Sequence, residues 1–291
     1  MSTRNSPQIG SNIVWRDAPT LSADVDGTRF VYRQLGPDTG VPVILLNHLA
    51  AELDRWDPRV VDGIATRRRV IVFDNRGIGA SGGKTPASVE AMARDAVAFI
   101  QALGLAQVDL LGFSLGGFIS QVIALEEPQL VRRIILAGTG PAGGTGIDQV
   151  TSITIRDMIK GALTFKHPEF YLFFTRTENG RRAAREFLGR LNERTANRDK
   201  PVSIPAFIAQ LKAIHAWGRQ PPADLSRIQH PVLVANGDQD KMVPSSNSVD
   251  LARRLPTAEL VLYADAGHGG IFQHHEAFLQ KALAFLEAWK T

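Results

Sequence analysis

A serine flanked by glycines has the setting in this chain that most clearly suggests chemistry. Residues 112–116 read Gly-Phe-Ser-Leu-Gly, with Ser114 at the centre. An apolar stretch at 108–111 precedes the motif, and a helical pattern at 115–125 follows it. A sharp strand-to-helix turn projects the serine oxygen and places the next amide, that of Leu115, at a helix N-terminus. The motif therefore predicts that Ser114 is a nucleophile and that the Leu115 amide stabilises the oxyanion formed on an attacked carbonyl.

A serine hydroxyl needs an adjacent base, and His268 is the best placed of the seven histidines. It lies in the glycine-rich turn 264–270, directly after an apolar stretch at 260–263. Because ligands bind where the carboxyl ends of parallel strands meet, this position returns the chain to the neighbourhood of Ser114. We therefore predict that His268 takes the serine proton.

The imidazole in turn needs a carboxylate to fix its tautomer and to stabilise its charged form. Asp238 and Asp240 both follow an apolar stretch at 232–235, and spacing alone does not separate them. Either choice gives the chain order serine, aspartate, histidine, which is the order known for one architecture with this motif.

The elements that would position these residues alternate between short apolar strands and longer helices. Buried strands are predicted at 41–46, 70–73, 108–111, 133–136, 232–235 and 260–263. Two further strands, 21–25 and 28–34, flank Asp26-Gly27, a strong hairpin signal, and are expected to lie antiparallel at one edge of the sheet. Helices are predicted at 89–103, 115–125 and 278–289. The alternation predicts an α/β fold, a mostly parallel sheet flanked by helices on both faces.

Residues 143–224 interrupt this alternation. They contain no convincing buried strand, are rich in aromatic residues and are punctuated by prolines. Such a stretch is too long for an ordinary loop, so we predict a helical cap, or lid, over the sheet edge where ligands bind. The predicted domains are a core of residues 1–142 and 225–291 and an inserted cap of residues 143–224.

Together these motifs resemble the capped α/β-hydrolases, and the resemblance extends from about residue 21 to the C-terminus. In that family the acid usually lies in a Gly-x-x-Asp-x-x-x-Pro stretch, which Gly237, Asp240 and Pro244 match. The resemblance therefore favours Asp240 over Asp238.

The loop after the strand at 41–46 departs from the family pattern. The family usually has His-Gly there, and the next residue's amide is the second oxyanion donor. Here Leu49 follows His48 in place of the glycine. The alignment assigns the second donor to the Ala50 amide, with the Leu49 amide as the alternative, and it gives His48 a structural role.

The resemblance implies a serine hydrolase, carboxylesterase-like, that uses the triad Ser114, Asp240 and His268 and needs no cofactor. The apolar, aromatic-rich cap favours a small hydrophobic ester as substrate. Cofactor-free haloperoxidases or perhydrolases, C–C bond hydrolases and lactonases use the same triad and stay open as alternatives. A small-molecule receptor with little turnover is a further alternative. Serine as nucleophile argues against the haloalkane dehalogenases and epoxide hydrolases, which use aspartate.

Composition argues against several other classes. The 291 residues carry a formal net charge of +4 and no cysteine, and the basic residues are scattered. We therefore predict no nucleic-acid-binding face, no disulfide and no thiolate metal site, and the histidines and acids lack metal-ligand spacing. Residues 1–5 lead into no apolar segment, and no stretch approaches the ~20 apolar residues of a membrane span. We expect a cytoplasmic protein without membrane contact, whose partner is a small hydrophobic substrate.

Overall fold

The computed structural model describes residues 13–288. The expectation for residues 1–5 and the predicted end of the last helix at Trp289 lie outside this range. Among residues 13–288, no helix combines the length and the apolar character needed to cross a membrane.

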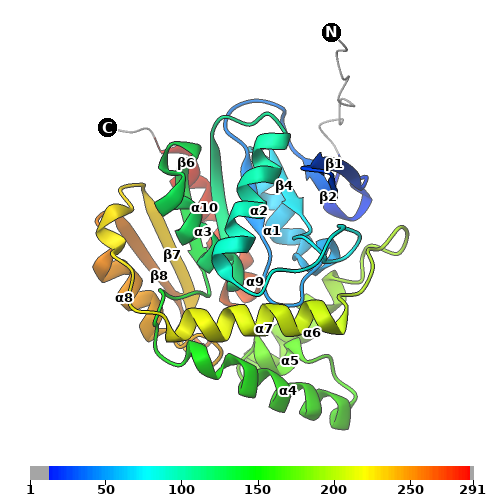
Figure 1. Cartoon of the computed structure of the whole chain (residues 1–291). Helices are drawn as coiled ribbons and strands as arrows, with labels where there is room; N and C mark the ends of the chain where they lie inside the picture. The colour runs from blue at the N-terminus through cyan, green and yellow to red at the C-terminus, as the bar shows by residue number, and fades with distance from the viewer. Residues whose placement is uncertain (1–12, 289–291) are drawn as a thin grey trace.

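An eight-stranded sheet forms the centre of the molecule, in the spatial order β1-β2-β4-β3-β5-β6-β7-β8 (Figure 1). The strands are β1 (Leu21–Val25), β2 (Thr28–Leu35), β3 (Val43–Leu46), β4 (Val70–Phe73), β5 (Val108–Phe113), β6 (Val131–Ala137), β7 (Val232–Gly237) and β8 (Ala258–Tyr263). β2 pairs antiparallel with both β1 and β4, and the pairs from β4 through to β8 are parallel. The predicted α/β fold with a mostly parallel sheet is confirmed.

The hairpin at the sheet edge follows from its two turn residues. Asp26 and Gly27 have φ angles of 50° and 76°, and they connect Val25 to its partner Thr28. Two consecutive residues at positive φ define the two-residue hairpin turn that Asp-Gly favours. The antiparallel edge predicted from this dipeptide is confirmed.

Helices cover both faces of the sheet. They are α1 (Pro58–Ala65), α2 (Val89–Ala102), α3 (Leu115–Glu126), α8 (Ser246–Arg254), α9 (Gly270–Gln273) and α10 (His275–Glu287). α2 and α3 pack together on one face, and α1 and α10 pack together on the other (Figure 1). β3 and β4 are buried along their whole length, which explains why each reads as a continuous apolar run. β5 is also buried throughout, and its one charged residue, Asp109, pairs with Arg68 and Arg132.

Residues 143–224 form helices and contain no strand. The helices are α4 (Val150–Thr164), α5 (Glu169–Leu172), α6 (Glu178–Arg190) and α7 (Ile204–Arg219). They lie together at one end of the sheet (Figure 1), and we call this stretch the helical insertion. The division of the chain into core and cap domains stays a prediction.

Candidate active site

Ser114 occupies the junction between β5 and α3 in a strained conformation. Its φ of 55° and ψ of −114° are unfavourable for a residue with a side chain. Its amide donates to the Ala137 carbonyl at 2.9 Å. Its own carbonyl accepts from the Gly117 amide at 2.8 Å and from the Thr139 hydroxyl at 2.9 Å. These bonds hold the backbone in this strained conformation, and Ser114 is buried where it lines a cavity.

The two glycines of the motif allow strand and helix to approach. A Cβ on Gly112 would lie 2.3 Å from the Gly116 carbonyl oxygen. A Cβ on Gly116 would lie 2.0 Å from the carbonyl oxygen of Leu46. Backbone atoms cannot yield at these distances, so both positions require glycine.

His268 and Asp240 form a buried pair. The imidazole Nδ1 and the carboxylate Oδ2 are 2.7 Å apart, and the residues are 2% and 6% exposed. The other carboxylate oxygen accepts hydrogen bonds from the amides of Met242 and Val243, at 2.8 and 3.0 Å. A carboxylate only accepts, so Nδ1 donates, and Nε2 of the neutral ring keeps its lone pair. Within the described residues, that Nε2 atom is buried and has no hydrogen-bond partner.

Asp240, and not Asp238, is the carboxylate beside the imidazole. The Asp238 side chain is exposed, and its Oδ1 lies 3.3 Å from the Ala266 amide. The choice that sequence spacing left open is thus resolved by geometry in the direction that the family resemblance favoured.

Strand order explains how residues so far apart in sequence meet. Ser114 follows β5, Asp240 follows β7 and His268 follows β8. β5, β6, β7 and β8 lie next to one another in the sheet in that order, and each pair is parallel. Their carboxyl ends therefore lie side by side at the edge where open α/β sheets bind ligands.

Ser114 and His268 line a cavity of about 400 Å³, a size typical of small-molecule sites. Core and helical insertion both contribute to its walls. The apolar side chains include Leu49, Met158, Leu172, Phe173, Ile204, Phe207 and Met242. The other polar side chains are His48, Glu52, Arg55, Thr154, His167 and Glu169.

One wall of the cavity carries an ion pair that the sequence did not reveal. The Nε of Arg55 donates to Oε1 of Glu169 at 3.2 Å, and a further Arg55 nitrogen lies 3.2 Å from the His167 ring. Burial would raise the pKa of Glu169, but the Arg55 guanidinium outweighs it and holds that pKa below its ordinary value. In the sequence, only the positions of the two residues could have suggested this pair. Arg55 precedes the aromatic Trp56, and Glu169 lies among the aromatics of the helical insertion.

His48 also reaches the cavity but has a different environment. Its ring lies 5.3 Å from that of Phe113 and 5.2 Å from that of Phe173, edge to face. Its Nδ1 lies 2.9 Å from the Leu49 carbonyl, which can only accept, so Nδ1 donates. Burial lowers the pKa of His48 to about 4, so the ring is neutral at neutral pH. This packing agrees with the structural role expected for it.

The structure places the Ala50 amide where it cannot serve as expected. Ala50 has a φ of 57°, and its amide donates to Oε1 of Gln210 at 2.8 Å. Gln210 is fully buried on α7 of the helical insertion. An amide bonded to a protein acceptor is not free to bind an oxyanion, so the assignment of this role to Ala50 is corrected. The alternative donor is the amide of Leu49, which lines the cavity.

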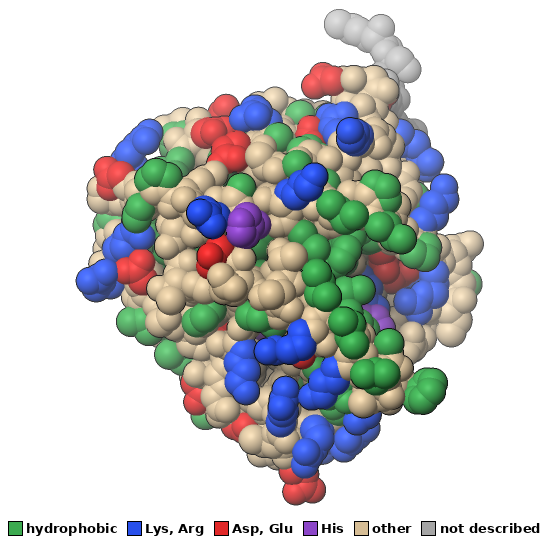
Figure 2. All heavy atoms as spheres, turned by 60° about the horizontal axis from the view of Figure 1, so that its bottom comes forward, with side chains coloured by type: hydrophobic (Ala, Val, Ile, Leu, Met, Phe, Trp, Pro, Cys, Tyr) green, Lys and Arg blue, Asp and Glu red, His purple; other side chains and the backbone are tan. Residues whose placement is uncertain are grey.

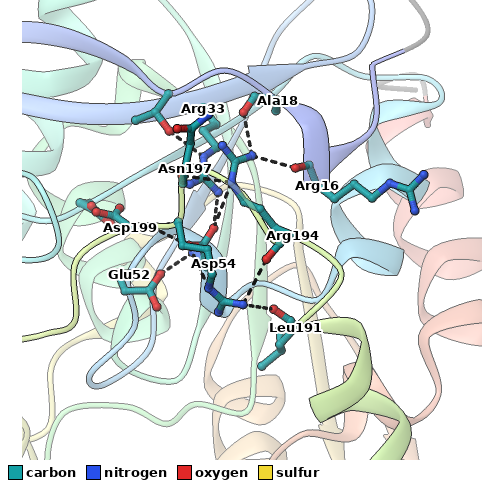
Figure 3. Close-up of polar contacts among 12 residues, drawn as sticks. Arg16, Ala18, Arg33, Glu52, Asp54, Leu191, Arg194, Asn197 and Asp199 are labelled. Carbon is teal, nitrogen blue, oxygen red and sulfur yellow. Dashed lines mark hydrogen bonds and ion pairs between the residues drawn. The ribbon is translucent and has the colours of Figure 1, made fainter.

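A buried charge network centred on Asp54 lies beside the cavity (Figure 3). Asp54 pairs with Arg33 at 2.5 Å and with Arg194 at 3.7 Å, and it accepts from the Asp199 amide at 2.7 Å. Glu52, which lines the cavity, accepts a hydrogen bond from the Asp54 amide. Burial, reinforced by the charge of Asp54, raises the pKa of Glu52 to about 7. The network thus joins the cavity wall to the helical insertion.

These groups together suit nucleophilic attack on a carbonyl. In such an attack Ser114 could supply the oxygen, His268 the base and Asp240 the orienting carboxylate. The Leu115 amide begins α3, where the helix dipole favours negative charge. No three His, Asp or Glu side chains among residues 13–288 are grouped so that they could hold a metal ion.

Three comparisons show what the chain is similar to. A family model described as "alpha/beta hydrolase fold" matches residues 41–275. The solved "Alpha/beta hydrolase fold protein from Chitinophaga pinensis" is 41% identical with a TM-score of 0.89, covering 95% of this chain and 100% of that one. "Putative carbamate hydrolase RutD" of Rhizobium rhizogenes is 30% identical over 84% of this chain and 92% of its own length. "Non-heme chloroperoxidase" of Streptomyces lividans is 27% identical over 90% of this chain and 98% of its own length.

Proposed function

The chain belongs to the α/β-hydrolase family, and we propose that it is a serine hydrolase that cleaves small hydrophobic carboxylic esters through an acyl-enzyme. The observation that carries this proposal is the buried pair of His268 and Asp240, 2.7 Å apart, at a cavity that Ser114 also lines. A neutral imidazole oriented by a carboxylate is the base that a serine hydroxyl needs.

In the first half of the reaction, Oγ of Ser114 attacks the ester carbonyl while Nε2 of His268 takes the hydroxyl proton. Asp240 accepts the Nδ1 hydrogen and stabilises the imidazolium. The amides of Leu115 and Leu49 donate to the oxyanion. The carbon–oxygen bond of the ester then breaks, and the alcohol leaves with the proton from His268, so that the acyl group stays on Ser114.

In the second half, water attacks the acyl-enzyme. His268 takes a proton from the water and returns it to Oγ of Ser114 as the acyl bond breaks. The products are the free carboxylic acid and the original enzyme, so the cycle balances without a cofactor.

The cavity lining supports a small substrate with one apolar part. Met158, Leu172 and Phe207 give an apolar surface for an acyl or alkyl chain. The ion pair of Arg55 and Glu169 in the same lining favours a second candidate, a carbamate, because its N–H and carbonyl could bond to charged partners. The relative named as a carbamate hydrolase gives that candidate independent support.

A substrate panel tests the proposal. Wild type, Ser114→Ala and the control Ser120→Ala are assayed with p-nitrophenyl acetate and butyrate, lactones, carbamates and amides; Ser120 is a buried serine of α3, the helix that follows Ser114. We expect turnover that Ser120→Ala retains and Ser114→Ala lowers by roughly 10⁴-fold or more. Absence of Ser114-dependent turnover across the panel would contradict the proposal and favour a receptor.

A further inference from the structure

An exposed apolar face covers α4 and the start of α7. It consists of seven large hydrophobic side chains that are 40% to 97% exposed: Ile155, Met158, Ile159, Leu163, Phe165, Ile204 and Ile208. On α4, Ile155, Ile159 and Leu163 recur every four residues and Met158 follows Ile155 by three, which puts these side chains on one side of that helix. Figure 2 turns this end of the molecule toward the viewer and shows hydrophobic side chains gathered on it. Exposed apolar patches of this kind mark interaction sites.

This apolar face borders the entrance to the cavity. Met158 and Ile204 belong to the face and also line the cavity. Phe207, the neighbour of Ile208 on α7, lines it as well. A molecule bound at the face could therefore pass into the cavity without leaving apolar surroundings.

Phe165 is exposed in a conformation that disfavours it. It ends α4 with φ 53° and ψ 37°, and it is 97% exposed. Glycine is the residue that this left-handed position ordinarily selects. An exposed phenyl ring contributes nothing to the core, so the strain has no compensation inside the fold. An aromatic side chain at this place suits insertion into a lipid interface.

The two stretches that carry the apolar face are basic. The stretches 150–168 and 200–215 together carry five basic residues, Arg156, Lys160, Lys166, Lys200 and Lys212. Their one acidic residue, Asp157, is buried and paired with Arg156. An apolar face on basic segments complements an anionic lipid surface. Two copies of the chain meeting at this face would oppose like charges, which disfavours self-association.

We propose that the apolar face docks on an anionic lipid surface, with the cavity entrance turned toward the lipid. The proposal goes beyond the proposed hydrolysis and does not depend on it. A docking face is assembled from two helices and needs no continuous apolar run. The expectation of no membrane contact rested on the absence of such a run and did not address this face.

Co-sedimentation with vesicles tests the proposal. Wild type is expected to bind phosphatidylglycerol vesicles, to bind them less at high salt, and to bind phosphatidylcholine vesicles weakly. Phe165→Gly should weaken binding by about tenfold or more, because one fully exposed aromatic ring is lost. The same variant should keep or raise the melting temperature, since glycine suits the backbone there. Lys166→Gln should weaken binding by about fivefold through the lost charge.

The matched control is Val249→Ser, which removes an exposed hydrophobic side chain on α8, outside the face, and should bind like wild type. Turnover of a water-soluble ester should be the same for wild type and Phe165→Gly. The proposal is overturned if wild type ignores phosphatidylglycerol vesicles or if Phe165→Gly binds them as tightly. A dimer in solution that Phe165→Gly dissociates would also overturn it, in favour of a second copy of the chain. Sedimentation needs no turnover, so its failure is distinct from failure of the hydrolase proposal.

Discussion

Two histidines reach the cavity, and their surroundings suit them to different roles. His268 has the Asp240 carboxylate 2.7 Å from its Nδ1, whereas Nδ1 of His48 faces the Leu49 carbonyl. A carboxylate stabilises the charged ring directly, while burial lowers the pKa of His48 to about 4. Of the two, His268 is therefore the one equipped to accept the serine proton.

The two aspartates after β7 provide a test of this assignment. Asp240→Asn should lower kcat by roughly 10³- to 10⁴-fold with KM nearly unchanged, because an amide cannot fix the tautomer or stabilise the imidazolium. Asp238→Asn is the matched control and should stay close to wild type, since its side chain is exposed. Steady-state kinetics on an ester that the wild type cleaves decide between them. Equal losses in the two variants would refute the role of Asp240.

Glu52 gives a second prediction, on stability. Its pKa of about 7 in the folded protein lies above its ordinary value of 4.5. Between these values the folded state holds a proton that the unfolded chain has released, so this group's contribution to stability falls as pH rises. Glu52→Gln cannot ionise, so at pH 8 it should be more stable than wild type by about 2 kcal/mol, with little difference at pH 4.5. Urea unfolding at both pH values measures this difference in stability, and Glu126→Gln, at an exposed position, is the control. A pH-independent difference would contradict the prediction.

Local signals were enough to predict Ser114 and His268, because a glycine-rich turn after an apolar strand is visible in a few residues. Asp240 needed the family resemblance, since Asp238 has almost the same local setting. The contact of Ala50 with Gln210 could not be predicted, because the two residues are 160 positions apart and local sequence patterns do not show which distant residues meet.

At the scale of elements, the sequence pattern located all eight described strands; the bounds of β1 and β4 are as predicted, and the other six strands differ at one end or at both. β5 continues to Phe113, because pairing with Ala137 of β6 extends beyond the apolar core of the strand. β3 begins at Val43 and not at residue 41, and Pro42, which has no amide to donate, precedes it. The four-residue helix α9 has too few residues for a periodic signal and depends on its tertiary contacts.

A pair of glycine substitutions tests the packing of the serine turn. Gly116→Ala should destabilise the protein by about 3 kcal/mol or more, because its Cβ would lie 2.0 Å from the Leu46 carbonyl oxygen. Gly189→Ala on α6 meets no atom within 4 Å and should be neutral or stabilising by about 0.5 to 1 kcal/mol. Urea unfolding gives both free energies. A Gly116→Ala variant as stable as wild type would show that this approach of α3 to β3 is not tight.

At the scale of the whole molecule, buried charge ties the helical insertion to the core. Asp54 lies between Arg33 of β2 and Arg194 of the insertion (Figure 3). Arg194 also donates to the carbonyls of Arg16 and Ala18, near the start of the described chain. Apolar periodicity indicates which faces are buried but gives no information on such ion pairs. The sequence could therefore predict the insertion and its helical character but not the ion pairs that attach it to the core.

The buried ion pairs of Asp54 predict a large effect of one substitution. Asp54→Asn should destabilise the protein by about 3 to 5 kcal/mol, because it leaves the fully buried Arg33 guanidinium without its countercharge. Asp17→Asn removes an exposed ion pair with Arg16 and should cost less than about 1 kcal/mol. Thermal and urea unfolding provide the comparison. Losses of similar size would mean that the buried network contributes no more than a surface pair.

The most direct test of the central claim, that Ser114 is an activated nucleophile, is covalent labelling with a fluorophosphonate followed by peptide mass spectrometry. The account predicts one adduct per chain, located on Ser114, absent from Ser114→Ala and formed much more slowly in Asp240→Asn. A wild type that stays unlabelled, or a Ser114→Ala variant labelled as fast as wild type, would contradict it.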